Sequence, residues 1–244
     1  MIIDLFRQGL SPQQIIYYII IYLFAMTLAF SIHEFMHAAV AVWLGDETPR
    51  NMGRLTLNPI AHVDPVGTIL LLIAGFGWGK PVMYNPSRLH RFKSHRWMNI
   101  MVHLAGVTGN FVLAYICLVL ATLFNGLLAR FPEFSNVFNP LYEVFIYTYV
   151  FSLMLLAFNL LPIPPLDGFH VLEELLPYKL KQTEGYRKFQ MFSPYIIWVV
   201  FLISTFSSIS ILGTVITFIQ TPFTILLELM TLPFHLLFIL LGLY

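Results

Sequence analysis

Long apolar segments restrict what this chain can fold into. A helix needs about 20 apolar residues to cross a bilayer, and four segments exceed that length: 15–44, 97–129, 189–217 and 222–243. A fifth, 141–161, is also long enough and ends at a run of prolines, where a regular helix cannot continue. Only 10 % of the residues are charged, against about 25 % in soluble domains. The sequence therefore predicts an all-α polytopic membrane protein with about five transmembrane helices.

Two shorter features lie between the first two long segments. Residues 66–77 are too few for a full helical crossing and suit a re-entrant or interfacial segment. The stretches 50–58 and 77–85 have the alternation and turn residues of two short strands. We expect them to pair as a small β-hairpin at the membrane face.

The segment 15–44 contains a compact polar cluster, His33, Glu34 and His37, which reads H-E-x-x-H. On a helix, positions i and i+4 share one face, so both imidazoles can reach one metal ion. Glu34 is then placed to take a proton from water that a zinc ion activates. Ionisable groups at membrane depth cost about 2.5 kcal/mol or more and indicate a functional site. A hydrogen-bonded polar patch between helices is the alternative interpretation.

Catalytic zinc usually has three protein ligands, so the two histidines require a third. Asp167 is the best candidate, because it follows an apolar helix within "NLLPIPPLDGFH", and broken backbone at membrane depth is tolerated where it lines a wet cavity. His170 is a second candidate, and His62, a loop histidine, remains a third. His103 lies inside an apolar segment, where we expect it to bond within the helix bundle.

The distribution of basic residues gives an orientation. If 66–77 does not cross, eleven of the 13 Lys and Arg residues lie on one face of the membrane, and ten do if it crosses. The helix of His33 and the segment before Asp167 must end on the same face to share an ion, which requires that 66–77 does not cross. Basic loops mark the cytoplasmic side. We therefore expect the N-terminus outside and the metal site toward the cytoplasm.

These motifs together resemble those of the site-2 protease family of intramembrane zinc metalloproteases. "HEFMH" matches its H-E-x-x-H, "NLLPIPPLDG" matches its N-x-x-P-x-x-P-x-D-G type motif, and "LAGVTGNF" is similar to its glycine-rich motif. The likeness covers about residues 15–175 and corresponds to a compact member without a PDZ or CBS domain. It implies an intramembrane metalloprotease core at 1–175, followed by C-terminal transmembrane helices at 176–244.

The resemblance also implies an activity, a cofactor and a set of site residues. The activity is hydrolysis of peptide bonds within or near transmembrane segments of membrane-protein substrates in the cell membrane. One Zn²⁺ per chain would be bound by His33, His37 and Asp167, and Glu34 would be the general base. The supporting residues would be Asn159, which helps to hold the substrate backbone, and Gly106 and Asn110, which let the middle helix pack closely.

The alternative function is that of a zinc-binding membrane protein without hydrolytic activity, such as a transporter or sensor. Glu34 has no obvious role in transport, so the sequence favours the protease. The net charge of +1 gives no basic excess that would suggest nucleic acid as a partner. The single Cys117 excludes an internal disulfide and a cysteine-based metal cluster. The expected partners are therefore the bilayer and a transmembrane-helix substrate, and the sequence indicates no oligomeric state.

Overall fold

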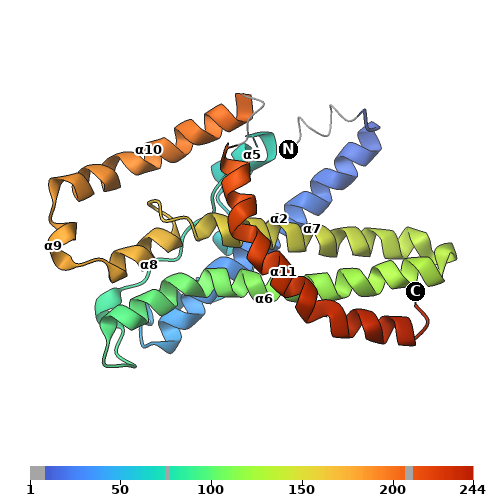
Figure 1. Ribbon diagram of the computed structural model, residues 1–244, viewed down its shortest axis with the longest axis horizontal. Helices are drawn as coiled ribbons and strands as arrows, with labels where there is room; N and C mark the ends of the chain where they lie inside the picture. Colours follow the sequence, from blue (N-terminus) through green and yellow to red (C-terminus); the bar gives the residue numbers. More distant parts are fainter. Residues whose placement is uncertain (1–8, 75–76, 207–210, 244) are drawn as a thin grey trace.

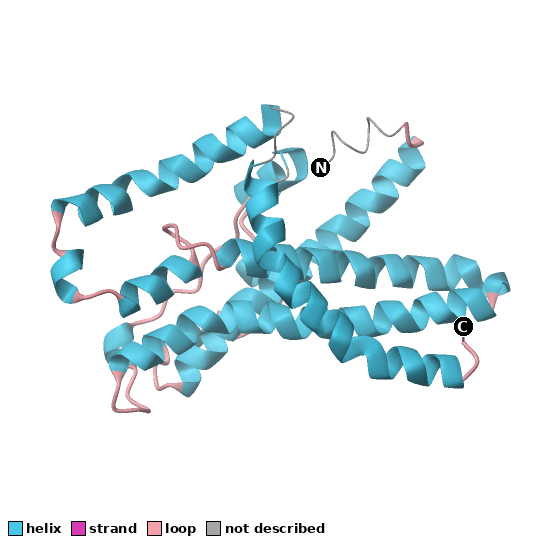
Figure 2. Cartoon of the chain, viewed as in Figure 1, coloured by secondary structure: helices cyan, strands magenta, loops and turns pink. Residues whose placement is uncertain are grey.

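The computed structural model describes residues 9–74, 77–206 and 211–243, and helices dominate this part of the chain (Figure 2). Four helices among the described residues are long and apolar enough to cross a membrane. They are α2 (Pro12–Trp43), α6 (His95–Arg130), α7 (Ser135–Asn159) and α11 (Ile211–Leu240). The prediction of a mainly helical, polytopic chain is therefore confirmed at this level.

The C-terminal part differs from the two segments predicted there. Residues 189–217 are divided between α10 (Glu184–Phe206) and α11, and residues 207–210 lie outside the described residues. α11 in turn continues through Pro222 and Pro233, which neighbouring groups allow in membrane helices. The predicted break before residue 222 was wrong.

The predicted β-hairpin does not appear in the described residues. In place of the first strand, the chain forms helix α3 (Thr48–Asn51), with Pro49 in its first turn, a position that suits proline. The β-pairing of the second stretch is limited to one bridge between Val63 and Gly79. Beside it, the Lys80 amide donates to the His62 carbonyl oxygen at 2.7 Å. Residues 77–85, which we call the strap, thus have no regular secondary structure beyond this bridge.

Short helices form the rest of the chain between and after the long ones. They are α4 (Pro59–His62), α5 (Pro65–Ala74), η1 (Pro86–Arg88), η2 (Pro132–Phe134), α8 (Asp167–Leu175) and α9 (Tyr178–Lys181). α5 has 10 residues and is therefore about 15 Å long, half the thickness of a hydrocarbon core. This length agrees with the expectation that residues 66–77 do not cross as a helix.

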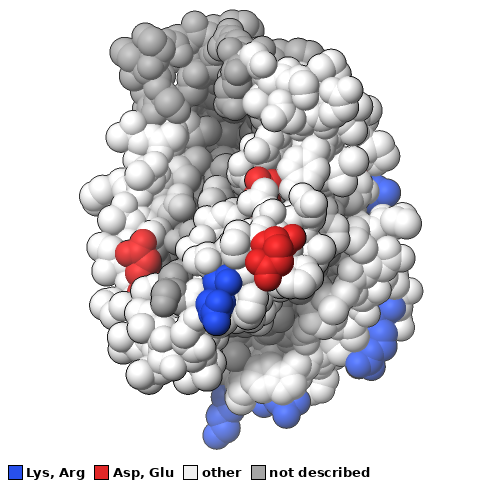
Figure 3. Space-filling model, turned by 90° about the vertical axis from the view of Figure 1, so that its right-hand side faces the viewer, with Lys and Arg blue, Asp and Glu red and all other residues white. Residues whose placement is uncertain are grey.

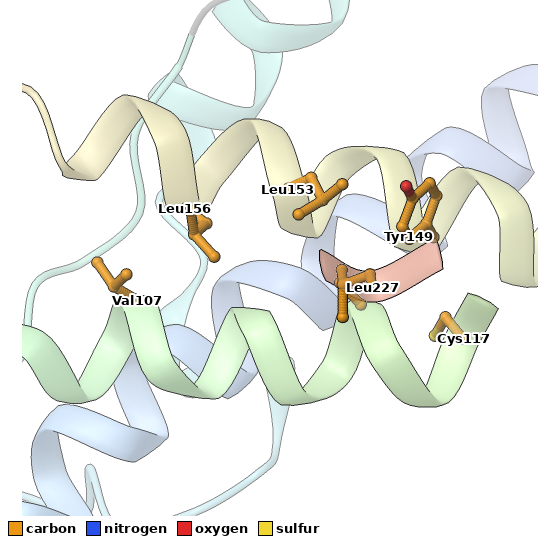
Figure 4. Close-up of a cluster of buried hydrophobic side chains, with 7 residues drawn as sticks. Val107, Cys117, Tyr149, Leu153, Leu156 and Leu227 are labelled. Carbon is orange, nitrogen blue, oxygen red and sulfur yellow. The ribbon is translucent and has the colours of Figure 1, made fainter. Parts of the chain in front are cut away.

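The long helices pack around α6 and α7, which run antiparallel, while α2 and α11 contact both of them (Figure 1). Figure 4 shows the side chains that meet at this seam: Val107 and Cys117 of α6, Tyr149, Leu153 and Leu156 of α7, and Leu227 of α11. Small buried residues on α6, among them Gly106 and Gly109, permit close approach of its neighbours. This packing brings the middle of α2 against α6, where the polar cluster lies.

Candidate metal centre

His33 and His37 lie one turn apart on α2, and Asp167 is the first residue of α8. The Nε2 atoms of the two histidines are 3.1 Å apart. Asp167 Oδ2 lies 3.1 Å from Nε2 of His33 and 3.3 Å from Nε2 of His37. Within the described residues, these three form the group whose ligand-type atoms converge as a metal site requires. The fold thus joins two segments that are far apart in the sequence.

The donor atoms at this point fit a divalent cation. Nδ1 of His37 lies 2.7 Å from the carbonyl oxygen of Val102, so Nδ1 carries the proton and Nε2 of the neutral ring keeps a lone pair. Asp167 Oδ2 is buried and accepts no hydrogen bond. With His33 in the same tautomer as His37, lone pairs of two nitrogens and one oxygen would face each other at this point. Two imidazoles and a carboxylate make a three-ligand set of the kind that catalytic zinc sites use.

Asn110 of α6 contacts the other histidine from behind. It is fully buried, its Nδ2 is 3.3 Å from His33 Nδ1, and its Oδ1 has no partner. Rotation of the amide by half a turn exchanges the two atoms. Oδ1 then accepts the proton of His33 Nδ1, and Nε2 keeps its lone pair for the metal. Asn110 and the Val102 carbonyl would then hold the two imidazoles in the same tautomer.

Gly106 brings α6 against both histidines. A Cβ atom at this position would lie 2.5 Å from His33 Cε1 and 2.5 Å from His37 Nε2, well inside van der Waals contact. Any side chain here would displace the imidazoles. Gly168, directly after Asp167, has a similar role for α8, because its Cβ would lie 2.3 Å from the carbonyl oxygen of Leu160. The Asp-Gly pair after the prolines is the signal in the sequence that could have identified Gly168.

Glu34 and Asn159 lie beside the three converging groups and line one cavity. Glu34 Oε2 accepts a hydrogen bond of 2.8 Å from the amide of Val82 in the strap. Asn159 donates through Nδ2 to the Leu155 carbonyl one turn earlier on α7, at 2.9 Å. The contact from Val82 leaves no signal in the sequence, because a backbone amide is common to almost every residue.

The strap is fixed at its far end by Asp46, which follows α2 and is fully buried. Asp46 accepts hydrogen bonds from the amide and hydroxyl of Thr48 and from the amide of Asn85. Burial alone would raise the pKa of this carboxyl, but these hydrogen bonds and the charge of Arg88 outweigh it, and the pKa is lowered. The strap is therefore held between the Val63–Gly79 bridge and an ionised carboxylate.

The other candidate ligands lie outside the converging group. His62 is buried and its Nε2 is 2.8 Å from the Thr56 carbonyl oxygen, which indicates a structural role in its loop. His103 of α6 contacts the Tyr84 hydroxyl at 3.0 Å and stacks on His170 of α8, with ring centroids 4.8 Å apart. His170 in turn lies 3.6 Å from Glu173. These residues form a polar network between α6, α8 and the strap.

Comparisons with known proteins agree with this geometry. The model of peptidase family M50 matches residues 133–204. The chain is 39 % identical over 180 residues to the putative zinc metalloprotease YwhC of Bacillus subtilis, covering 72 % of this chain and 78 % of YwhC.

Two further relatives are more distant. The chain is 34 % identical to the putative zinc metalloprotease Rip2 of Mycolicibacterium smegmatis, over 60 % of this chain and 53 % of that protein. For Rip2 of Mycobacterium tuberculosis (strain H37Rv) the identity is 33 %, over 58 % of this chain and 52 % of the relative. The chain thus spans about half the length of the Rip2 proteins, and no solved structure matches it. By its likeness to YwhC over most of both chains, this multi-pass membrane protein belongs to peptidase family M50, the site-2 protease family of zinc metalloproteases.

Proposed function

We propose that this zinc metalloprotease works inside the membrane and hydrolyses peptide bonds within or near transmembrane segments of membrane-protein substrates. The observation that carries the proposal is the position of the three candidate metal ligands. His33, His37 and Asp167 converge beside Glu34, on helices that are long and apolar enough to cross a bilayer or directly after one. Hydrolytic groups at this depth suit a substrate that lies in the same bilayer.

The chemistry is assigned to four side chains. His33 and His37 would hold the zinc ion through Nε2 and Asp167 through Oδ2, the atoms that converge. Bound zinc supplies a Lewis acid that polarises the substrate carbonyl and makes water acidic. Glu34 accepts the proton of the attacking water and passes it to the nitrogen of the breaking peptide bond, as a general base and then a general acid. The Val82 amide holds Oε2 of Glu34 during both transfers.

The cavity beside Glu34 supports an apolar chain segment as the substrate. It has a volume of about 410 Å³ and is bounded by α2, α7, the strap, the loop residues Pro165 and Leu166, and the start of α11. Most of its lining side chains are aliphatic or aromatic. Asn159 lies in its wall and would hold the backbone of the bound segment. Because a helical peptide bond is already hydrogen-bonded and shielded, the substrate must unwind locally to reach Glu34.

Charge supports a location of the site on the cytoplasmic side of the cell membrane. Eleven of the 13 Lys and Arg residues lie in or next to the segments 44–96 and 160–188, which join the helices at the end nearer the metal centre. Figure 3 views the opposite end of the molecule, where α6 and α7 meet, and uncharged residues dominate that view. Basic excess on one face is the usual mark of the cytoplasmic side.

The test is the zinc content of the detergent-purified protein together with cleavage of a single-span substrate in proteoliposomes. We expect about one zinc per chain in the wild type and its loss in Asp167→Ala and His33→Ala. His62→Ala is the matched control, since His62 is buried but bonds within its own loop, and it should keep the zinc. Zinc bound equally well without Asp167 would refute the ligand set. A zinc-loaded wild type that cleaves soluble peptides but no membrane-inserted substrate would refute the intramembrane activity.

A further inference from the structure

The cavity beside Glu34 extends from the metal centre in one direction. Along α2 its wall runs from Glu34 back through Phe30 to Met26, and along α7 from Asn159 back through Met154 to Phe151. Met26 precedes His33 by seven residues, about 10 Å along a helix. The cavity therefore extends from the metal centre toward the N-terminal half of α2, and Pro165 and Leu166, just before α8, line it beside the metal centre.

The opposite side of the metal centre has a different chemistry. There the Tyr84 hydroxyl, the stacked His103 and His170, and Glu173 form the polar network. The His170 side chain is 39 % exposed. A peptide that passes Glu34 in extended form would thus meet apolar walls on one side of the scissile bond and polar, solvated groups on the other.

The cavity is partly open rather than an enclosed void. Its volume of about 410 Å³ is in the range of pockets that bind organic ligands. The walls also belong to five separate segments, namely α2, the strap, α7, the loop before α8 and α11, which reach the same space as Glu34. These features fit a space that a bound apolar group fills next to the reacting bond.

Building on the proposed function, we propose that this cavity determines cleavage specificity by taking a bulky apolar side chain, of the size of Leu, Met or Phe, on one side of the scissile bond only. The side that it reads is the one that continues toward the N-terminal half of α2. Substrate residues on the other side of the bond lie along the polar network and contribute little to specificity. The substrate class is therefore an apolar segment with an asymmetric requirement, and Met154, in the cavity wall, is a specificity-determining residue.

The first experiment varies the substrate and keeps the enzyme unchanged. A single-span substrate in proteoliposomes carries Leu, Phe, Ala or Gln at each of three positions on either side of a scissile bond located by mass spectrometry. Replacing a bulky apolar residue by Ala or Gln should lower kcat/KM about tenfold or more at a position on one side, because a filled apolar pocket discriminates to that degree. Changes within about threefold on both sides, or equal losses on both sides, would overturn the inference.

The second experiment changes the cavity and keeps the substrates unchanged. Met154→Phe narrows it and should lower the cleavage of the Phe substrate about tenfold relative to the Ala substrate, while Met154→Ala should shift the ratio the opposite way. The matched control is Val150→Phe, one turn earlier on α7 and 43 % exposed, which should leave the ratio unchanged. Zinc content must be equal in the four proteins, so that misfolding is not read as specificity.

The outcomes separate this inference from the proposal on which it rests. A zinc-loaded wild type that cleaves every member of the substrate series at the same rate refutes the specificity cavity and leaves the intramembrane protease intact. A change of all rates by the same factor in Met154→Phe also refutes it and indicates a lipid chain or a structural void in the cavity. Absence of any cleavage of membrane-inserted substrate refutes the proposed function itself.

Discussion

The two halves of the α2–α7 pair are built in different ways. Near the metal centre, Gly106 of α6 lies against the two histidines of α2 with no room for a methyl group. In the half farther from the metal centre, large rings fill the space. The ring of Tyr22 packs edge-on against those of Tyr147 and Phe151, with centroid distances of 4.7 Å and 5.8 Å. The ring centroids of Tyr18 and Tyr147 are 6.3 Å apart.

This difference shows where the fold requires accuracy. Each aromatic pair contributes about 0.5–1.5 kcal/mol beyond the area that it buries, and neighbouring rings can shift to accommodate a change. Around His33 and His37, by contrast, the contacts are directional polar ones, with the Val102 carbonyl on one ring and the Asn110 side chain on the other. Substitutions in the half near the metal centre should therefore lower activity and zinc affinity. Substitutions in the aromatic half should lower only the stability of the fold.

The largest effect is expected for Glu34→Gln. Loss of a general base lowers kcat by about 10²–10⁴-fold, and zinc content should be unchanged because Glu34 lies outside the converging ligand atoms. Substrate cleavage and metal analysis of the same preparation measure both. Glu143→Gln, a carboxylate in the aromatic half that bonds to Asn139, is the control and should keep full activity. Full activity in Glu34→Gln would contradict its assignment as the base.

Gly106→Ala should weaken zinc binding by more than about a hundredfold, because the new Cβ overlaps both histidine rings and metal sites tolerate little displacement of their ligands. Competition with a chelator measures the affinity. Gly109→Ala is the matched control on the same helix, since its Cβ meets Met36 Cγ, in a flexible side chain. Equal zinc affinities in the two variants would show that the histidines can move together, and the contrast between the halves would fail.

Asn110→Leu removes the acceptor proposed for His33 Nδ1 and keeps the volume of the side chain. Loss of such a second contact to a metal ligand typically costs 10–100-fold in metal affinity, and we expect that range here. The measurement is again chelator competition, with Ser152→Ala as the control at a buried position of α7. Zinc affinity within twofold of the wild type would mean that His33 keeps its tautomer without help.

The smallest effect is expected in the aromatic half. Tyr147→Leu removes the edge-on contacts to Tyr18 and Tyr22 and should lower the free energy of unfolding by about 1–2 kcal/mol. Zinc affinity should stay unchanged, since Tyr147 lies three turns before Asn159 on α7. Unfolding in mixed detergent micelles, followed by circular dichroism, measures the stability. A large loss of zinc in this variant would show that the two halves are tightly coupled.

The three candidate metal ligands could be predicted from the sequence because each is a polar residue within or just after an apolar segment. His33 and His37 stand out in an apolar helix, and Asp167 follows prolines that end another. Polar functional side chains are therefore easy to recognise in the sequence of an apolar helix. Contacts made by backbone atoms leave no such signal, and the hydrogen bond from the Val82 amide to Glu34 could not be anticipated.

The predicted strands and the predicted boundaries of the C-terminal helices were wrong. Alternation in residues 50–58 suggested a strand, but Pro49 starts a helical turn there, and a lone hairpin has little stability without a larger sheet. In the C-terminal part, hydropathy is high throughout 189–243. Because the whole stretch is apolar, hydropathy did not indicate where α10 ends and α11 begins. It also did not indicate that α11 continues through Pro222.

The distance along the chain between His33 and Asp167 has a consequence for biosynthesis. The ribosome makes α2 first, and its two histidines enter the membrane before α6, α7 and α8 exist. A nascent chain shorter than 167 residues lacks the carboxylate, and one that ends before Gly106 also lacks the helix that packs against the imidazoles. The proposed metal centre therefore assembles only when most of the chain has been translated, and prematurely terminated products carry no complete set of the proposed ligands into the bilayer.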